Sequence, residues 1–277
     1  MAKQVSDSST MTLRKTGGLG WVRDLPDPRD AMYSAPTGIL QELPEKIDLT
    51  LGFPAYQQGR IGSCTANALA AALEFDRLKA NENPEFTPSR LFIYFNERKI
   101  EGHIATDSGA QLRDGIKTLK TLGVCREDEW PYDDTPPTYE GGPFPVGAKP
   151  AVEPPKACYK DAVTHVITSY HRLTQTLSQL QGCLASGFPF VFGFTVFDGW
   201  YNSRPLPAVI PLPSKNDTPI GGHAVMCIGY DNSTSLFKIR NSWGVEVGDN
   251  GDFYIPYAYL ASGNLSNDFW VINTVKS

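Results

Sequence analysis

The chain has 277 residues, of which 41% are hydrophobic and 20% are charged, so it has the composition of a globular protein with one large domain or two lobes. Its 25 basic and 30 acidic side chains give a net charge of −5. The charges are spread without blocks, which argues against a nucleic-acid-binding protein or one that lies on an acidic membrane surface. No apolar run approaches the roughly 18 residues of a transmembrane helix.

The N-terminal region contains two different stretches. Residues 1–15 are polar and lack the apolar core of a secretory signal, which predicts a cytoplasmic protein or one exported without a recognisable signal peptide. We expect residues 1–20 to be flexible. Residues 20–30 combine Trp21 with prolines and alternating charges, so they can hold an extended shape and dock on a surface. A disordered tail is the alternative.

The five cysteines are odd in number and widely spaced, with no Cys-x-x-Cys pair: Cys64, Cys125, Cys158, Cys183 and Cys227. This pattern argues against a zinc site and against a dense disulfide framework. A reduced chain with one functional thiol fits it better.

Cys64 follows a glycine-punctuated loop and begins an alanine- and leucine-rich run that extends to Phe75. The run predicts a helix that is buried on most sides. Ser63 suits the N-cap position and would place Cys64 in the first turn, where free N–H groups and the helix dipole stabilise a thiolate. A buried structural cysteine is the alternative at this point.

Two more helices are predicted before the chain changes character. Thr87 is expected to cap the first of them, with Pro88 at its first position, and it carries apolar residues from Leu91 to Ile100. Ser108 is expected to cap the second, which ends near Gly123. Residues 133–157 are rich in proline and glycine without periodicity, which predicts a long ordered surface connection between lobes.

The second half of the chain is predicted to be mostly β-structure, with a helix around residues 174–186. The expected strands are Val163–Thr168, Phe190–Val196, Ala224–Tyr230, Ser235–Arg240, Asp252–Ile255 and Phe269–Asn273. The predicted fold class is therefore α+β, with a helical first lobe and a mainly β second lobe.

His223 is the histidine best placed for chemistry, because it follows two glycines and opens an apolar strand. Asn241 lies 18 residues later, at the end of the next predicted strand, and could accept a hydrogen bond from the imidazole. Trp243 could shield that bond from water. His223, Asn241 and Trp243 are each a weak signal of function when taken alone. The remaining histidines fit surface or core positions: His103, His165 and His171.

Taken together, three ordered motifs resemble the papain family of cysteine proteases: Gln58-Gly59-x-x-Gly62-Ser63-Cys64, Gly222-His223-Ala224-Val225 and Asn241-Ser242-Trp243-Gly244. The resemblance covers roughly residues 43–277. Further segments are similar to family motifs: Leu43–Asp48 at the mature start, Trp130–Asp133, and Gly248–Phe253.

The resemblance implies a papain-like two-lobe fold, with a helical left lobe, an antiparallel β-barrel-like right lobe and the active-site cleft between them. It assigns Cys64 as nucleophile, His223 as its ion-pair partner and general acid, and Asn241 as the group that orients His223. The Gln58 amide and the Cys64 N–H would form the oxyanion hole. No metal or organic cofactor is required.

The resemblance also predicts how peptide or protein substrates bind to this enzyme, which we expect to be a monomer. Gly109 and Ala110 would pair with the substrate backbone. Leu112 and Gly221 would line a roomy apolar pocket. Gly222 and Trp243 complete the predicted substrate-binding set.

Three departures distinguish this chain from the family pattern. Ile61 stands where a disulfide cysteine is usual, Thr65 stands where an aromatic residue usually follows the nucleophile, and the long family propeptide is missing. The layout is similar to bacterial members with short N-terminal extensions. We therefore expect a zymogen with an extension over 1–42, of which residues 20–40 cover the cleft, a helical lobe over 43–160 and a β lobe over 161–277.

Two other functions remain compatible with the same residues. One is a papain-fold module without proteolytic turnover, or a permanently blocked zymogen. The other is an acyl transferase or deamidase that uses the same triad.

Overall fold

The computed structural model describes residues 18–50, 52–80 and 86–273. The helices are α1 (Thr37–Gln41), α2 (Cys64–Lys79), α3 (Arg90–Glu101), α4 (Leu112–Thr121), the 3₁₀ helix η2 (Lys149–Ala151), α5 (Lys156–Ala162), α6 (Leu177–Ala185), α7 (Asp198–Tyr201) and α8 (Tyr257–Ala261). The strands are β1 (Trp21–Val22), β2 (Met32–Tyr33), β3 (Lys46–Asp48), β4 (Ala110–Gln111), β5 (Ser169–Leu173), β6 (Phe190–Phe197), β7 (Pro219–Asp231), β8 (Leu236–Arg240), β9 (Asp252–Pro256) and β10 (Ser266–Asn273).

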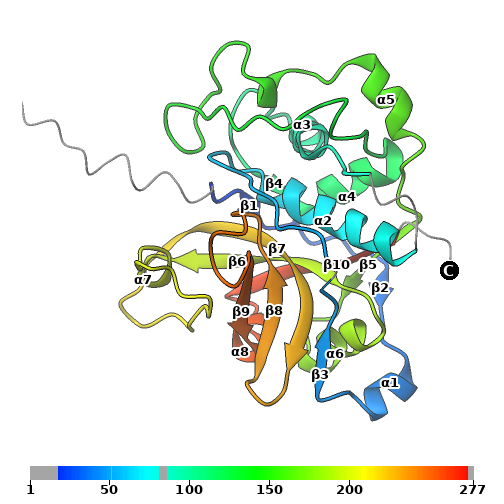
Figure 1. Cartoon of the computed structure of the whole chain (residues 1–277), viewed down its shortest axis with the longest axis vertical. Helices are drawn as coiled ribbons and strands as arrows, with labels where there is room; N and C mark the ends of the chain where they lie inside the picture. The colour runs from blue at the N-terminus through cyan, green and yellow to red at the C-terminus, as the bar shows by residue number, and fades with distance from the viewer. Residues whose placement is uncertain (1–17, 51, 81–85, 274–277) are drawn as a thin grey trace, which may run out of the picture.

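The described chain forms a helix-rich part, made of α2 to α5, above a β-rich part (Figure 1). Within the described residues, the large sheet has the order β2-β5-β10-β6-β7-β8-β9, and β3 pairs with β7. The small sheet β1-β4 lies where the two parts meet (Figure 1). The extension contributes strands to both sheets, because β1 pairs with β4 and β2 pairs with β5. The boundaries at 42/43 and 160/161 stay predictions.

Helix α2 is the element that joins the two parts, since it contacts α3 and α4 on one side and β7 on the other. Its alanine-rich run is buried on most sides, as predicted, and the helix extends to Lys79. Ser63 occupies the N-cap position, but its hydroxyl caps no helix amide. That hydroxyl instead bonds to the Tyr132 hydroxyl and accepts from the Asn67 amide.

The predicted cap of α3 is wrong by two residues. The helix begins at Arg90, and Ser89 is its N-cap, with an Oγ that accepts the Phe92 N–H at 3.2 Å. Pro88 lies before the helix and bridges to Arg126 instead.

The predicted cap of α4 is also wrong. Gly109 adopts a φ of 69°, and the following Ala110 and Gln111 are extended, so Ser108 lies too early to cap the helix. The N-cap is Gln111, and the helix ends near Gly123 as predicted.

Five of the six predicted strands lie within observed strands or start within a residue of one. The exception is Val163–Thr168, which is a turn after α5 because the Thr164 and His165 amides donate to carbonyls of Asp161 and Ala162. Its β-branched residues favour a strand, but Val163 and Val166 are exposed, and the strand starts at Ser169.

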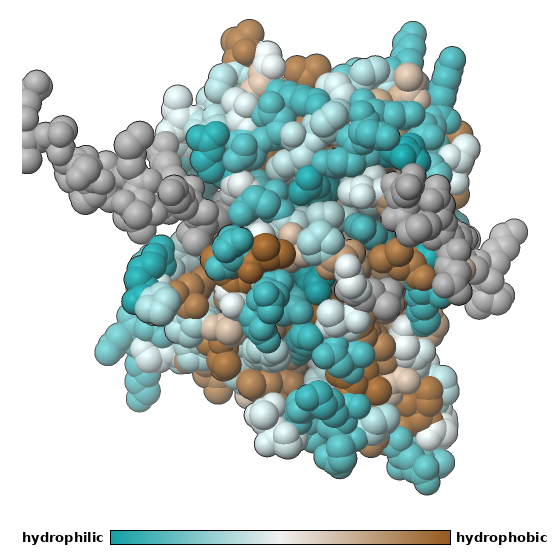
Figure 2. All heavy atoms as spheres, viewed as in Figure 1, coloured by the Kyte–Doolittle hydropathy of each residue, from teal (hydrophilic) through white to brown (hydrophobic). Residues whose placement is uncertain are grey.

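Two apolar cores support this arrangement. One lies between the helices and the sheet, and the other lies inside the curved sheet, under α6 and α8. On the face in Figure 2, apolar residues reach the surface mainly across the middle and over the β-rich part. Among the described residues, no helix has the length and apolar character needed to cross a bilayer.

Arg98 anchors the long connection over 133–157, which joins α4 to α5 inside the helix-rich part instead of linking the two parts as predicted. Its guanidinium is fully buried and donates to the carbonyls of Ile104 and Thr106 at 2.9 Å, and to that of Pro150. It also donates to the Tyr94 carbonyl at 3.1 Å. The proline-rich connection is therefore ordered, as predicted.

We expect Arg98→Met to lower the free energy of unfolding by about 3 kcal/mol or more, because four buried carbonyls would lose their donor. Urea unfolding followed by tryptophan fluorescence measures the change. Lys99→Met is the matched control. Lys99 is half exposed in its pair with Glu153, so its loss should cost about 1 kcal/mol at most. Equal effects of the two substitutions would contradict the anchoring role.

Candidate active site

Cys64 is the first residue of α2, as the sequence predicts, and it is fully buried. Burial raises the pKa of its thiol to about 12, against the lowering effect of hydrogen bonds from the backbones of Ala224 and Gly20. The helix N-terminus alone therefore does not produce a thiolate in this state.

His223 and Asn241 come together in the β-rich part. His223 lies on β7, Asn241 directly follows β8, and the imidazole Nε2 is 2.7 Å from the Asn241 Oδ1. The same oxygen accepts the Ser242 N–H at 2.7 Å, so it acts as an acceptor and Nε2 carries the proton. This tautomer leaves Nδ1 as a proton acceptor, and that buried nitrogen has no hydrogen-bond partner among the described residues.

The His223 ring is enclosed by aromatic side chains. Trp243 stacks on it with a centroid separation of 4.7 Å, and Phe194 contacts it edge-on at 5.7 Å. Burial lowers the pKa of His223 to about 4, and the bond to Asn241 opposes this effect. Both Cys64 and His223 are therefore neutral near pH 7 in this state.

Gln58 is held beside the nucleophile by a residue to which the sequence analysis assigned no role. Ser242 Oγ donates to the Gln58 Oε1 at 2.7 Å, so the amide N–H groups face the loop before α2. They donate to the carbonyls of Ile61 at 3.0 Å and of Gly18 at 2.9 Å. The family-like motif that begins at Asn241 contains Ser242, but only the structure shows its bond to Gln58.

Tyr132 was also missed as a supporting residue. Its hydroxyl donates to the Gln58 carbonyl at 2.9 Å and bonds to the Ser63 hydroxyl, which immediately precedes the nucleophile. The sequence analysis identified Trp130–Asp133 as similar to a family motif, but nothing in the sequence indicated this contact.

The chain's own N-terminal segment lies against Gln58 and Ala110. The Gly18 carbonyl lies on the Gln58 amide, and the Gly20 carbonyl accepts the Ala110 N–H at 2.8 Å. Strand β1 then runs parallel to β4, with Trp21 opposite Ala110. Residues 18–20 are thus docked, and their predicted flexibility is wrong. The rest of that prediction, residues 1–17, lies outside the described residues.

Most of the predicted substrate-binding residues contact this segment. A Cβ at Gly109 would lie 2.0 Å from the Gly20 carbonyl oxygen, and one at Gly221 would lie 2.8 Å from the Leu19 side chain. Gly222 touches Trp21 in the same way. Leu112 is buried in the core at the start of α4, and Trp243 contacts His223 rather than the segment's backbone.

The rest of the segment is held by a group of charged residues that we call the clamp: Asp24, Asp30, Arg113, Arg172 and Asp268. Arg113, on α4, donates from Nε to one Asp30 carboxylate oxygen at 3.1 Å and from Nη2 to the other. Arg172, on β5, pairs with Asp30 at 3.2 Å and with Asp268 at 2.7 Å. The clamp therefore fixes the segment to both parts of the protein.

Asp24 is the buried centre of the clamp. It accepts the Arg113 N–H at 3.1 Å and the Trp270 indole N–H at 2.9 Å, and its own N–H donates to Asp268. Burial, followed by the charge of Asp268, raises the pKa of Asp24 to about 6.

Two of the three departures from the family pattern, Ile61 and Thr65, have polar contacts nearby. Ile61 is buried, and the adjacent Gly62 N–H is bound by the Asp107 carboxylate at 2.9 Å. Thr65 Oγ donates to the buried Glu97 at 2.7 Å. The loop and the helix start are thus held without a disulfide, and all five cysteines are free.

Comparison with known proteins gives consistent matches. A model described as papain family cysteine protease matches residues 43–266. The crystal structure of xylellain, a cysteine protease from Xylella fastidiosa, is 54% identical with a TM-score of 0.92, and covers 95% of this chain and 98% of that one.

Two further matches are more distant. An uncharacterized peptidase C1-like protein of Acanthamoeba polyphaga mimivirus is 34% identical over 97% of this chain and 89% of its own. The procathepsin B S9 structure from Trypanosoma congolense is 17% identical with a TM-score of 0.70, over 100% and 94% of the two chains, and shows likeness of fold. This chain belongs to the papain family of cysteine proteases.

Proposed function

We propose that the chain is a latent endopeptidase in which Cys64, His223, Asn241 and Gln58 carry out peptide hydrolysis, and in which the N-terminal segment blocks the cleft. The observation that carries this proposal is the pair of contacts made by one short segment. The Gly18 carbonyl accepts a hydrogen bond from the Gln58 side-chain amide at 2.9 Å, and the Gly20 backbone forms a hydrogen bond with the Cys64 sulfur.

The reaction begins when His223 Nδ1 takes the thiol proton and the Cys64 sulfur attacks the substrate carbonyl carbon. The carbonyl oxygen becomes an oxyanion, which the Gln58 side-chain amide and the Cys64 N–H stabilise. The tetrahedral intermediate collapses, the C–N bond breaks, and the leaving amine takes the proton from His223. Water, deprotonated by His223, then hydrolyses the thioester and frees the thiol.

Asn241 supports each step by accepting from Nε2, which keeps Nδ1 as the nitrogen that exchanges protons. Trp243 stacks on the ring and excludes water from that bond. Ser242 keeps the Gln58 N–H groups turned toward the reacting carbonyl by donating to the amide oxygen.

The docked segment opposes this chemistry in two ways. It uses the Gln58 donor, and it excludes water so that the neutral forms of Cys64 and His223 are favoured over an ion pair. A proform, procathepsin B, is among the structures similar to this chain, which supports the same arrangement.

Removal of the segment should therefore raise activity. We expect the chain without residues 1–42 to cleave a fluorogenic peptide at least about tenfold faster than the full chain, since the oxyanion donor and the thiol become free. The chain without residues 1–17 is the matched control and should stay as slow as the full chain, because it keeps Gly18 to Trp21.

Residues 32–42 contribute to the sheet, so a second variant protects this test from misfolding. Trp21→Ala in the full chain leaves β2 and α1 in place and should also raise the rate. Equal rates for all four proteins would rule out autoinhibition by this segment.

The catalytic assignments predict graded losses in the activated form. Cys64→Ala and His223→Ala should abolish peptide cleavage, and Gln58→Ala should lower kcat by about 10²–10³-fold, as for the loss of one oxyanion donor. Cys183→Ala, in the core of the β-rich part, is the control and should keep the rate. A wild-type rate for Gln58→Ala would refute its assignment.

A thiol-directed epoxide and a peptide-library digest separate this function from its alternatives. Labelling of Cys64, lost in His223→Ala, indicates an activated thiol, and no labelling of Cys64 after segment removal would indicate a module without turnover. New peptide termini identify a protease. Changed side-chain amides without new termini would identify an acyl transferase or deamidase.

The clamp predicts a pH dependence of latency. The pKa of Asp24 is raised from about 3.8 to about 6 in the docked state, so docking is favoured by the protonated form. Docking should be strongest below about pH 4 and weaken as pH rises through 6, by up to roughly 100-fold. The measurement is the peptide-cleavage rate of the chain without residues 1–42, divided by that of the full chain, between pH 4 and 7.5.

Asp24→Asn tests the origin of that slope. The amide is uncharged at every pH, so the ratio should lose most of its dependence on pH, whatever its absolute level. A slope equal to that of the unmodified chain would exclude Asp24 as the titrating group.

A further inference from the structure

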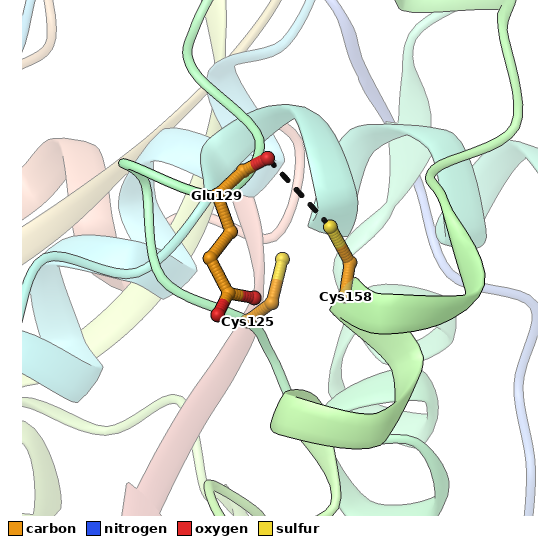
Figure 3. Close-up of side chains that lie close together, drawn as sticks. All are labelled: Cys125, Glu129 and Cys158. Atoms are coloured by element: carbon orange, nitrogen blue, oxygen red, sulfur yellow. Dashed lines mark hydrogen bonds between the residues drawn. The ribbon is translucent and has the colours of Figure 1, made fainter.

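A cluster of three metal-binding side chains lies away from the cleft, in the helix-rich part. Cys125 follows α4, Glu129 lies four residues later, and Cys158 lies on α5. One ligand atom from each residue lies within 4.8 Å of the others. Figure 3 shows the three side chains next to one another, with Cys125 between Glu129 and Cys158.

We propose that Cys125, Glu129 and Cys158 bind a soft divalent cation of the zinc class. Two thiolates and a carboxylate form a donor set that favours zinc over calcium or magnesium. A tetrahedral zinc ion requires sulfur and oxygen ligands about 3.6–3.8 Å apart. The three groups therefore need only small side-chain rotations to take up that geometry.

The backbone around the cluster is already fixed. The Cys125 carbonyl accepts the Ser89 N–H at 2.9 Å, and the Cys158 thiol donates to the Glu129 carbonyl at 3.8 Å (Figure 3). The Arg126 N–H donates to the Asp161 carboxylate at 3.2 Å, which ties the segment to α5. The backbone that carries the ligands is thus fixed before any ion binds, and this lowers the entropic cost of binding.

The charges around the cluster favour a cation. Desolvation, followed by the negative charges of Asp161 and Asp128, raises the pKa of the Glu129 carboxyl. Of the nearby cations, Arg126 is paired with Asp128, and Lys149 donates to a backbone carbonyl. Both cysteines are buried while Glu129 is exposed, so an ion can enter from the Glu129 side, and water can take the fourth position.

The sequence pattern concealed this cluster. The two cysteines are 158 − 125 = 33 residues apart, with the proline-rich connection between them, so they match no short zinc-ligand spacing. The expectation that a zinc site is improbable rested on that spacing. The fold brings the residues together because α5 packs beside the segment after α4.

Binding would close the 126–157 connection at its base. The two thiol protons leave to solvent as the thiolates bind the ion, and no oxidant or reductant takes part. The segment that carries two of the ligands continues to Tyr132, which supports Gln58 and Ser63 in the active site. The bound ion would therefore stabilise the structure that holds the nucleophile loop.

The test uses the full chain with Cys64→Ser, reduced and stripped of metal, so that neither the catalytic thiol nor activity contributes to the result. Co²⁺ is added as a spectroscopic probe, followed by Zn²⁺. We expect one ion per chain, a thiolate-to-cobalt charge-transfer band that Zn²⁺ abolishes, and a higher Tm with Zn²⁺ bound.

Substitutions assign the ligands. Cys125→Ser or Cys158→Ser should lower the affinity at least about 100-fold, and the exposed Glu129→Gln, which carries little risk to folding, at least about tenfold. Two controls should bind as before: Asp128→Asn, a neighbouring carboxylate, and Cys183→Ala, a thiol of the other core.

Several results would overturn the proposal. Absence of a stoichiometric ion in the folded reduced chain would do so, as would unchanged binding after both cysteine substitutions. A third such result would combine two observations. The reduced chain would take up no metal, and oxidised glutathione would lower the mass of the chain by two hydrogens in a change that a reductant reverses. That outcome would make the pair a disulfide instead.

Discussion

The active site depends on a short antiparallel contact between two loops that belong to different parts of the protein. The Gln58 N–H donates to the Ser242 carbonyl at 2.8 Å, the Gly244 N–H donates to the Tyr56 carbonyl at 2.8 Å, and Gln57 bridges Trp243. Cys64, the proposed nucleophile, belongs to α2, whereas His223 belongs to the sheet, so this contact and the packing of α2 on β7 together set their relative position. Ser242 makes the contact chemically specific, because its N–H holds the amide of Asn241 while its hydroxyl holds that of Gln58.

The segment 18–24 exploits the same junction. Its backbone takes the hydrogen bonds that a peptide would take, and its side chains cover glycines of β6 and β7, so that both titrating groups lie out of water. A buried thiol and a buried imidazole then favour their neutral forms. In the full chain, His223 therefore keeps its bond to Asn241 while Cys64 and His223 are both neutral, which is consistent with the proposed latency.

Local pattern was sufficient to predict the α+β class, the helix that starts at Cys64 and five of the six strands. The residues that meet in the site were predicted from the resemblance of three motifs to the papain family. Local pattern failed where local signals compete. Ser63 is predicted to cap the helix with its side chain, but its hydroxyl forms a hydrogen bond with the Tyr132 hydroxyl instead. Residues 163–168 are rich in β-branched side chains that favour a strand, but hydrogen bonds to the end of α5 form a turn there. Ser242, the clamp and the Cys125–Cys158 pair join residues that are distant in sequence, and no local spacing encodes such contacts.

The bond between Asp107 and the Gly62 amide lies beside Ile61, the position where the family usually has a disulfide cysteine. A carboxylate does not react with thiols. Reducing agents that keep Cys64 in its reactive form therefore leave the loop that carries it intact. The shape of this loop and the oxidation state of the Cys64 sulfur are therefore chemically independent of each other.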